Sequence, residues 1–231
     1  MYEISDLTKQ YKRGKETINA LNGVNVLIPD GDMLAIQGPT GHGKSTLLQL
    51  LGGLDRPTSG SLLFDGRDMA KLNEMQLTKL RSQNFGYIFQ SFNLIPTLTA
   101  QENVETALVP LKISAAERKE RAARALAEVG LGDRVGHLQG ELSGGQQQRV
   151  AIARALVKEP KVIMADEPTG NLDEDTRDEI FGLLEKLWRE RNLTVIMVTH
   201  DSAIANRVPR LAQIKNGKLT IKREAPSAVT S

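Results

Sequence analysis

The segment Gly38–Thr46 has the residue types and spacing of a phosphate-binding loop. Its glycines let successive backbone N–H groups converge on phosphate oxygens, and the start of a helix adds partial positive charge there. The loop follows the apolar run Met33–Gln37 and precedes a helical pattern, which is the context that such a loop requires. Lys44 would pair with β- and γ-phosphate oxygens, and Ser45 would offer a hydroxyl to Mg²⁺. A glycine turn with a merely solvated lysine is the weaker alternative.

One side chain in this loop invites a second interpretation. His42 lies between two glycines. We expect it to contribute its backbone N–H to phosphate binding while its side chain points away. A catalytic role is less favoured, because histidines often serve only as polar surface groups.

Two acids end a second apolar run. Asp166 and Glu167 follow Val162–Ala165, and open α/β sheets bind ligands at the carboxyl ends of their strands. Asp166 would hold Mg²⁺, partly through its water shell, and Glu167 would orient and deprotonate an attacking water. Such acids often only cap turns, so the pair gains its weight from the phosphate loop upstream.

A serine and two glycines open another helical pattern within Leu142–Gln146. They form a second anion-binding helix N-terminus, which one nucleotide does not need from one chain. We therefore predict a head-to-tail dimer, in which this turn of each copy closes over the γ-phosphate at the other copy's loop. A plain helix cap would explain Ser143 but not the glycine pair followed by Gln146.

Strand-like and helical patterns alternate along the chain, which predicts an α/β fold with a mainly parallel sheet. The strands are expected at Met33–Gln37, Phe85–Phe89, Val162–Ala165 and Thr194–Val198. The helices are expected at Lys44–Leu54, Ala115–Val129, Gln146–Lys158 and Glu174–Arg191. An N-terminal antiparallel β layer is expected from Tyr2–Leu7, Val24–Ile28 and Ser61–Phe64, and a C-terminal hairpin from Leu211–Lys222 with its turn at Asn216 and Gly217.

The segment Ser91–Glu141 interrupts this alternation with helical sequence and no convincing strand. We predict a single domain over residues 1–223, with an inserted helical subdomain at about 91–145 and a short tail at 224–231. Ser114 begins a capping-box pattern, and Gly130 can end the same helix in the left-handed conformation. Asp173 can cap the helix that follows it.

Composition narrows the class of protein. A formal charge of +2 gives no argument for nucleic acid or an acidic membrane surface, and the absence of cysteine excludes a disulfide framework and a cysteine-based zinc site. The N-terminus lacks an apolar secretory core, and no apolar run approaches the roughly 20 residues that span a bilayer. If such a protein works at a membrane, something else holds it there.

In their order along the chain, these motifs resemble those of the nucleotide-binding subunits of ATP-binding cassette (ABC) transporters, and the resemblance covers almost the whole chain. It implies a P-loop NTPase core, ATP and Mg²⁺ as cofactors, and ATP hydrolysis. It further implies that Tyr11 stacks on adenine, that Gln90 senses Mg²⁺ and the attacking water, and that His200 contacts the γ-phosphate. Asn171–Asp173 would cross the dimer interface.

The predicted site residues fall into three groups. The catalytic residues are Glu167, His200 and Gln90. The metal ligands are Ser45, Gln90 and Asp166. The nucleotide-binding residues are Tyr11, Gly38, Thr40, Gly41, His42, Gly43, Lys44, Ser45, Thr46, Ser143, Gly144, Gly145, Gln146 and Asp173.

Three segments narrow the resemblance. The segments are Leu51–Gly60, Phe92–Pro96 and Ala165–Asp173. They are similar to those of the lipoprotein-releasing, macrolide-exporting and antimicrobial-peptide-resistance branch, and cell-division ATPases of the same branch are similar too. In that branch the family implies a permease whose motion transmits force across the membrane without carrying substrate through it. Thr40 and His42 stand where serines are common, but the glycine framework and Lys44 are kept.

The resemblance implies two partners, a second copy of the chain and a transmembrane permease, and a cytoplasmic position on the inner face of the cell membrane. Apolar residues after Gln90 are candidates for a groove that receives a cytoplasmic helix of the permease: Phe92, Leu94, Ile95 and Leu98. They could equally fill the core of the helical subdomain, because burial cannot be read from so short a run.

Two other functions stay open at this point. A regulatory ATPase that controls cell-wall enzymes through a membrane partner would use the same motor. A soluble ABC ATPase acting on nucleic acid or ribosomes is less favoured, because the chain has no long coiled-coil insertion, second cassette or zinc-binding cysteines. The transported substrate, the permease and the direction of work are set by another polypeptide.

Overall fold

The computed structural model describes residues 1–14 and 16–224. Contacts divide the chain into two compact units. The first holds Met1–Leu77 together with the described residues from Thr194 onward, and the second holds Thr78–Leu193. Of the predicted tail, only Glu224 is described, and 225–231 lie outside the described residues.

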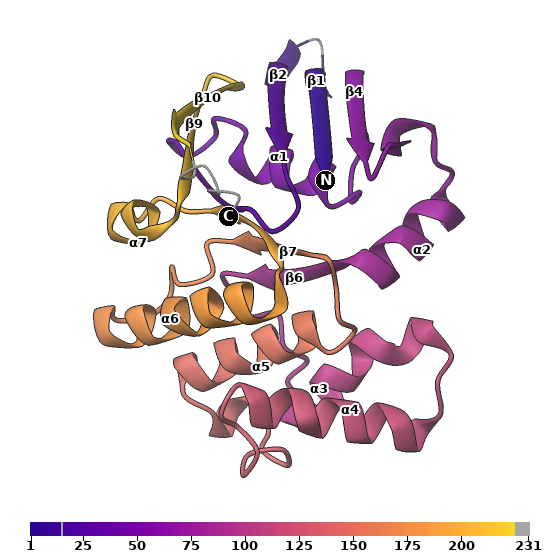
Figure 1. The fold of residues 1–231 in the computed structure, drawn as a ribbon, viewed down its shortest axis with the longest axis vertical. Helices are drawn as coiled ribbons and strands as arrows, with labels where there is room; N and C mark the ends of the chain where they lie inside the picture. The colour runs from indigo at the N-terminus through magenta and orange to yellow at the C-terminus, as the bar shows by residue number, and fades with distance from the viewer. Residues whose placement is uncertain (15, 225–231) are drawn as a thin grey trace, which may run out of the picture. The chain divides into compact units, whose positions relative to one another are not determined.

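The first unit contains an antiparallel sheet in the order β2-β1-β4-β5 (Figure 1). Its strands are β1 (Tyr2–Arg13), β2 (Glu16–Ile28), β4 (Ser59–Phe64) and β5 (Arg67–Asp68). This confirms the predicted antiparallel layer, but β1 and β2 continue far beyond the predicted apolar runs. The extensions are held by backbone pairing, such as Lys12 with Thr17, and carry no apolar alternation from which they could be predicted.

The same unit contains parallel strands that carry the phosphate loop. Strand β3 (Met33–Gln37) lies between β8 (Thr194–Val198) and β9 (Arg210–Lys215) and is parallel to both. Its first four residues are buried, as expected for a central parallel strand. Strand β10 (Lys218–Arg223) returns antiparallel to β9 through Asn216 and Gly217, which have φ of 51° and 74°. These values fit the predicted two-residue hairpin turn.

The helices of the first unit are short. The phosphate loop leads into α1 (Lys44–Leu51), and Asp201 caps α7 (Ser202–Arg207). A 3₁₀ turn, η1 (Met69–Lys71), precedes α2 (Glu74–Asn84), which runs from the first unit into the second. Helix α2 was not predicted, because Leu77 and Leu80 are its only buried apolar residues and give too weak a period.

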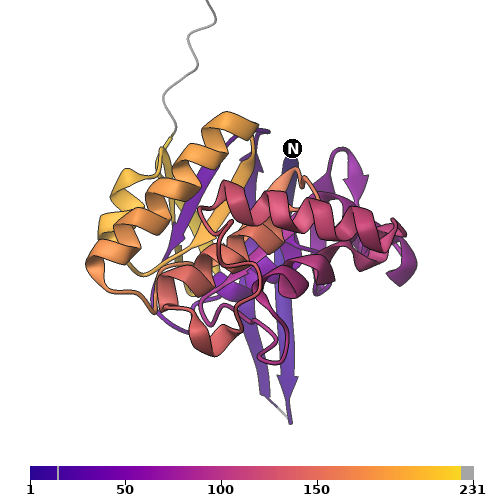
Figure 2. The same cartoon turned by 90° about the horizontal axis from the view of Figure 1, so that it is seen from below.

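The second unit combines two parallel strands with a group of helices. Strands β6 (Phe85–Phe89) and β7 (Val162–Asp166) pair from Phe85 opposite Val162 to Phe89 opposite Asp166. The helical elements are α3 (Ala100–Glu105), η2 (Thr106–Leu111), α4 (Ala115–Glu128), η3 (Gln139–Glu141), α5 (Gly144–Leu156) and α6 (Glu174–Arg191). Helices α3, α4 and α5 pack against one another, as Figures 1 and 2 show. Apart from the isolated bridge between Thr99 and Leu138, no strand pairing occurs among the described residues of 91–141, as predicted.

Local capping chemistry sets several helix ends. Asp173 accepts the N–H of Thr176 and caps α6, whose bounds are those predicted. Ser114 caps α4, but the predicted capping box is only half formed, because Glu117 pairs with Arg121 instead of returning to the cap. Helix α4 ends before a glycine at φ 79°, in the predicted left-handed conformation.

The helices were also compared with the length and hydrophobicity that a membrane-spanning helix needs. Within the part of the chain that the structure describes, every helix is too short or too polar to cross a bilayer.

Candidate nucleotide-binding and catalytic site

The loop Gly38–Thr46 joins β3 to the first turn of α1, and two of its glycines lie close to the backbone of other strands. A Cβ atom at Gly38 would collide with the carbonyl oxygen of Ile214 in β9, and one at Gly43 with the carbonyl oxygen of Ala20 in β2. Gly43 also has φ of 101°, a left-handed conformation that L-residues avoid. The loop is therefore held tightly between β2 and β9, with its N–H groups at the start of a helix.

Lys44 is the charged group at the centre of this loop. Its side chain is buried, and its Nζ donates to the carbonyl oxygens of Gly38 at 2.7 Å and Pro39 at 3.1 Å. Both of these partners are neutral. A buried ammonium held by carbonyl dipoles is a strong attractor for the charge of a phosphate group.

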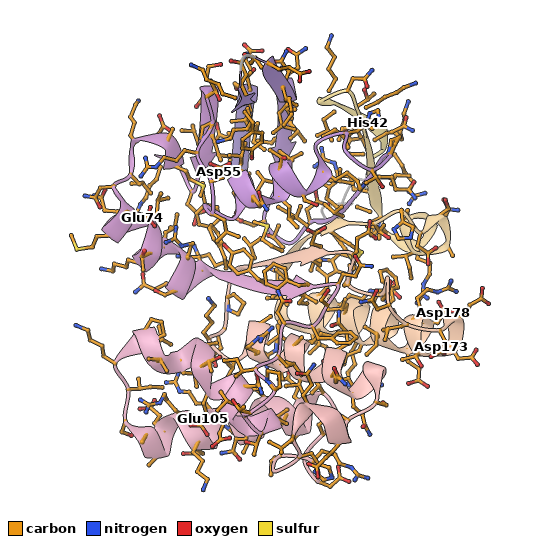
Figure 3. All side chains as sticks on the ribbon, turned by 180° about the vertical axis from the view of Figure 1, so that it is seen from behind. His42, Asp55, Glu74, Glu105, Asp173 and Asp178 are labelled. Atoms are coloured by element: carbon orange, nitrogen blue, oxygen red, sulfur yellow. The ribbon has the colours of Figure 1, made fainter. Side chains whose placement is uncertain are left out.

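His42 is fixed by the hairpin turn of the same unit, and its side chain is labelled in Figure 3. Its Nδ1 accepts the backbone N–H of Asn216 at 3.0 Å, and its carbonyl oxygen accepts the N–H of Gly217 at 3.3 Å. Because Nδ1 accepts a hydrogen bond, the ring proton lies on Nε2. The side chain thus braces the loop against the β9–β10 turn, which fits the expectation that it has no catalytic role.

His200 emerges beside the phosphate loop. It follows β8, and Val198 of β8 lies opposite Ile36 of β3. The N–H of Thr199 donates to the carbonyl oxygen of Ile36, so the two strands end at the same level. His200 and Gly38 therefore leave neighbouring parallel strands at their carboxyl ends, where α/β sheets bind ligands.

In the second unit, the predicted Mg²⁺ ligand and general base lie at the end of β7. Asp166 is the last residue of the strand, and both it and Glu167 are half-buried. Glu167 has φ of 50°, and its carbonyl oxygen accepts the N–H of Gly170 at 3.0 Å. A non-glycine residue in this conformation costs about 1 kcal/mol or more, and such strain concentrates at functional sites.

Gln90 is bound to the loop that follows Glu167. Its amide donates to the Asn171 side chain at 3.0 Å, and the Asn171 amide donates back to the Gln90 carbonyl oxygen at 3.0 Å. The pairing follows from β6 and β7 being parallel neighbours, because Gln90 and Glu167 both come directly after them. A Cβ at Gly170 would lie 3.0 Å from the Gln90 amide nitrogen, so this glycine makes room for the pair.

The turn at Ser143 is a complete capping box. The Ser143 hydroxyl accepts the N–H of Gln146 at 3.3 Å, and the Gln146 side chain accepts the N–H of Ser143 at 2.9 Å. Gly145 has a packing reason that the sequence did not reveal, because a Cβ there would lie 2.5 Å from Cγ2 of Thr176 in α6. Gly144 has no such constraint, since its Cβ would meet Leu172 at an ordinary 3.4 Å.

This contact predicts the effect of filling Gly145. Gly145→Ala should lower the free energy of unfolding by about 1–3 kcal/mol, because the α5–α6 approach is already closed. Thr176→Ser removes Cγ2 while keeping the hydroxyl that bonds Asp173, so it should restore most of this loss in the double variant. Urea unfolding of the four proteins measures the coupling.

Gly182→Ala is the matched control, since it lies on α6 with nothing within 4 Å of its Cβ position. It should stabilise the helix by roughly 0.5–1 kcal/mol. If Gly145→Ala were tolerated as well as this control, the packing account would be wrong.

Asp173 is exposed, and its carboxylate is used within its own helix (Figure 3). Hydrogen bonds from the backbone N–H and the hydroxyl of Thr176 lower the pKa of this carboxyl below its ordinary value. Within the described residues, Asp173 thus caps α6.

The two units therefore hold separate parts of the predicted site. The first brings together the phosphate loop and His200, and also carries Tyr11 on β1. The second brings Gln90 to the loop after Glu167, and it carries Asp166, the Ser143 turn and Asp173. Sequence reasoning missed Lys9 and Asp55 as partners of Tyr11, because no motif gave them that role and they lie 46 positions apart.

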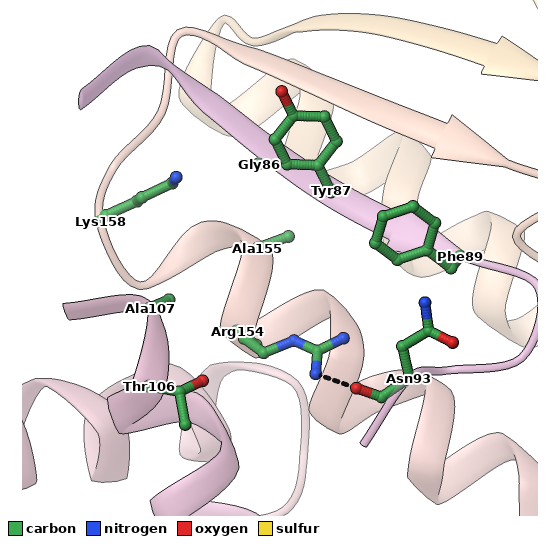
Figure 4. Close-up of a pocket in the computed structure, with 9 residues that line it drawn as sticks. All are labelled: Gly86, Tyr87, Phe89, Asn93, Thr106, Ala107, Arg154, Ala155 and Lys158. Atoms are coloured by element: carbon green, nitrogen blue, oxygen red, sulfur yellow. Dashed lines mark hydrogen bonds between the residues drawn. The ribbon is translucent and has the colours of Figure 1, made fainter. Parts of the chain in front are cut away.

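A cavity of about 240 Å³ lies within the second unit (Figure 4). Its walls come from β6, η2, α5, the turn after α5 and the segment after Gln90: Gly86, Tyr87, Phe89, Asn93, Thr106, Ala107, Arg154, Ala155 and Lys158. The four apolar residues predicted for a groove do not line it; Leu94 is buried, Ile95 is exposed, and Phe92 and Leu98 are half-buried.

Two cations define the character of this cavity. Arg154 donates to the carbonyl oxygens of Phe92 and Asn93, which both have positive φ, so it stabilises a strained turn. Burial lowers the pKa of Lys158 to about 8, and its Nζ donates to the carbonyl oxygen of Arg81. None of the described residues that line the cavity is acidic. The cavity is therefore electropositive with an aromatic wall.

The chain also matches known proteins over nearly its whole length. The family model for ABC transporters matches residues 21–170. The lipoprotein-releasing system ATP-binding protein LolD of Geobacter metallireducens is 46% identical over 222 residues, covering 95% of this chain and 97% of that one. The macrolide export ATP-binding/permease protein MacB of Hyphomonas neptunium is 46% identical over 219 residues, and this chain spans only 34% of its length.

A solved structure of an ATP-binding cassette also matches the fold of this chain. The ATP-binding cassette MJ0796, described as a dimeric post-hydrolysis state bound to ADP and Pi, superimposes with a TM-score of 0.87 at 44% identity, covering 96% of this chain and 97% of that one. Fold and phosphate loop define an α/β nucleotide-binding ATPase. The chain belongs to the ABC transporter family, as the motifs predicted, and it is an ATP-binding ATPase domain of the LolD and MacB type.

Proposed function

We propose that this chain binds ATP with Mg²⁺, forms a head-to-tail dimer around two ATP molecules, and hydrolyses them to drive a separate membrane permease. The observation that carries the proposal is the phosphate loop. Gly38 and Gly43 are closed in by β9 and β2, and the Lys44 ammonium is buried among neutral carbonyl dipoles.

In this proposal the first unit binds the nucleotide. Tyr11 stacks on the adenine ring, and His200 contacts the γ-phosphate. Lys44 pairs with β- and γ-phosphate oxygens. The remaining phosphate contacts come from the loop backbone at Gly38, Thr40, Gly41, His42 and Gly43, with Thr46 in the first turn of α1.

The residues assigned to Mg²⁺ suit that ion. Ser45, Gln90 and Asp166 offer a hydroxyl, an amide oxygen and a carboxylate, which are the hard oxygen donors that Mg²⁺ prefers. Across residues 1–14 and 16–224, no three acidic or histidine side chains form a metal-binding group. An ion held by these residues and by nucleotide phosphates would neutralise the charge that develops on the β- and γ-oxygens.

The second unit supplies the base. Glu167 accepts a proton from the attacking water as the new O–P bond forms, and the bond between the γ-phosphorus and the bridging oxygen breaks to release ADP. Gln90 orients that water through its side-chain amide. The pairing of Gln90 with Asn171 supports this assignment, because it attaches the glutamine to the loop that follows Glu167.

The other copy of the chain completes each site. Helix α5 has 13 residues, and its N-terminus carries the Ser143 cap and two glycines. This N-terminus is suited to binding an anionic group. Ser143, Gly144, Gly145 and Gln146 would close over the γ-phosphate of the partner's ATP, and Asp173 would approach the same site. The dimeric state described for MJ0796 supports this arrangement.

The work leaves through a membrane partner. LolD is named as the ATP-binding protein of a lipoprotein-releasing system, and MacB joins ATP-binding and permease parts in one chain. We therefore assign this chain to the cytoplasmic side of the cell membrane, held by its permease. The electropositive cavity of the second unit is the proposed receptor for a cytoplasmic helix of that permease.

A cavity-filling variant tests this assignment. Ala107→Phe should lower the amount of tagged chain that stays on membranes of its source organism at least fivefold. The isolated protein should keep its ATPase activity, because Ala107 lines the cavity and none of the assigned catalytic residues does. Val109→Phe, on the same 3₁₀ segment but 61% exposed, is the matched control and should leave the chain on the membrane. Retention of Ala107→Phe with its membrane-spanning partner would show that the permease docks elsewhere.

A further inference from the structure

Tyr11 is held by two charged residues, Lys9 and Asp55, to which the sequence motifs gave no role. Its hydroxyl donates to Oδ2 of Asp55 at 2.8 Å, and the Nζ of Lys9 lies 4.8 Å from the centre of its ring. Lys9 also donates to Oδ1 of Asp55 at 2.7 Å. The three side chains form a closed triangle of hydrogen bond, ion pair and cation–π contact. All three belong to the first unit.

Asp55 is anchored firmly to the helix that starts at the phosphate loop. After α1 ends, the N–H of Leu54 donates to the carbonyl oxygen of Gln49 at 2.8 Å, which folds the chain back. Asp55 Oδ1 accepts the N–H of Arg56 at 2.7 Å, and Lys9 Nζ donates to the Arg56 carbonyl oxygen at 2.8 Å. Figure 3 labels Asp55 in this turn.

The turn is also hydrogen-bonded to β1, the strand that carries Tyr11. The N–H of Thr58 donates to the carbonyl oxygen of Thr8 at 2.8 Å, and the N–H of Gln10 donates to the Thr58 hydroxyl at 3.0 Å. The position of the Tyr11 hydroxyl is therefore set relative to α1, whose first residue is Lys44.

Protonation keeps each partner in the form that this triangle needs. Burial, and then the Asp55 carboxylate, raises the pKa of the Tyr11 hydroxyl, so it stays a donor. Burial acts to raise the pKa of the Asp55 carboxyl, but hydrogen bonds from Lys9, Tyr11 and Arg56 outweigh it and hold that pKa below its ordinary value. At neutral pH the carboxylate remains ionised and an acceptor.

Lys9 takes one face of the Tyr11 ring. Tyr11 is 37% exposed, and the Lys9 ammonium lies over one side of its ring. A base that stacks on Tyr11 takes the opposite face, and a ring that is fixed before binding loses less entropy on stacking. Lys9 itself is well buried, with 12% of its side chain exposed, so it is not available to contact the base from solvent.

We infer that Lys9 and Asp55 are positioning residues for nucleotide binding: they fix the orientation of Tyr11 relative to the phosphate loop and reserve one ring face for adenine. This rests on the proposed function, in which Tyr11 is the adenine platform. The two residues act through Tyr11 and not by touching the nucleotide.

The test separates the base from the phosphates. Binding of ATP and of inorganic tripolyphosphate is measured by calorimetry for wild type, Asp55→Ala, Lys9→Met, Tyr11→Ala and the double variant Tyr11→Ala/Asp55→Ala. Asp55→Ala and Lys9→Met should weaken ATP binding about three- to tenfold, a part of the effect of losing a stacked base. Tripolyphosphate affinity should change less than twofold, because the phosphate loop is untouched.

The double variant identifies the route of the effect. If Asp55 acts through Tyr11, adding Asp55→Ala to Tyr11→Ala should cause no further loss of ATP affinity. Lys71→Met removes an exposed ion pair with Asp68 in the same unit and should leave both ligands unaffected.

Each failure has its own meaning. If Tyr11→Ala changes the affinities for ATP and for tripolyphosphate by the same factor, the adenine platform assigned in the proposed function is wrong. The inference then falls with it. If Tyr11→Ala weakens ATP binding but Asp55→Ala and Lys9→Met do not, only the positioning inference is overturned. Equal losses for ATP and tripolyphosphate would instead show a general structural defect and would also overturn it.

Discussion

Glu167→Gln is expected to lower the rate of ATP hydrolysis by about 10²–10⁴-fold, the usual contribution of a general base. Glutamine keeps the size and the hydrogen-bonding reach of the side chain but cannot take a proton from water. ATP affinity should stay within about threefold of wild type, because Lys44 and the loop N–H groups are unchanged. Phosphate release at saturating ATP and Mg²⁺ measures the rate.

The same variant should also change the assembly. If ATP is what joins the two copies, blocking hydrolysis prolongs the closed state, so Glu167→Gln should form a dimer with ATP that wild type forms only briefly. Light scattering with ATP, with ADP and without nucleotide distinguishes these states. A variant that stays monomeric with ATP and Mg²⁺ would contradict the proposed dimer.

The chain provides a close control for this change. Glu159 also has a positive φ, 54°, and also precedes a proline, as Glu167 does. Both substitutions therefore place glutamine in the same unusual backbone conformation. Glu159→Gln should hydrolyse ATP at the wild-type rate, so a loss confined to Glu167→Gln reflects the missing base and not backbone strain.

Mixing two inactive variants is expected to restore hydrolysis if the dimer is head-to-tail. Lys44→Ala removes a charged partner of the phosphates, worth about 1.5–3 kcal/mol, and should weaken ATP binding roughly 10–100-fold. Gly144→Asp places a carboxylate at the start of α5, where it favours the helix but repels a γ-phosphate. The Gly144 site has room for a Cβ, so this variant should fold.

In a mixed dimer, one site combines both defects and the other is intact. Random pairing makes half of the dimers mixed, so about a quarter of the wild-type rate is expected if sites act independently in a two-fold dimer. A mixture of Lys44→Ala with the double variant Lys44→Ala/Gly144→Asp contains no intact site and is the control. No recovery, when differently tagged copies are shown to pair, would exclude composite sites.

Much of the proposed nucleotide site was determined locally by the sequence. The phosphate loop, the acids after β7 and the caps at Ser143 and Asp173 depend on residues a few positions apart. Strand β3 and helix α6 were placed at their observed bounds for the same reason, since apolar period and cap chemistry act within one element. The resemblance of these motifs to the ABC transporter family was confirmed by the comparisons.

What only the tertiary structure decided depends on contacts between distant residues. Gly145 is fixed by Thr176 of another helix, and the turn after Gln90 is stabilised by Arg154, 61 or 62 positions away. Tyr11 was implied by the resemblance to ABC transporters, but its attachment to Asp55 had no local signal. Such contacts are set by how strands and helices pack, because side chains far apart in sequence meet only once the backbone between them is folded. The sequence thus pointed to the groups proposed to do the chemistry, and the tertiary structure showed which distant residues hold them in place.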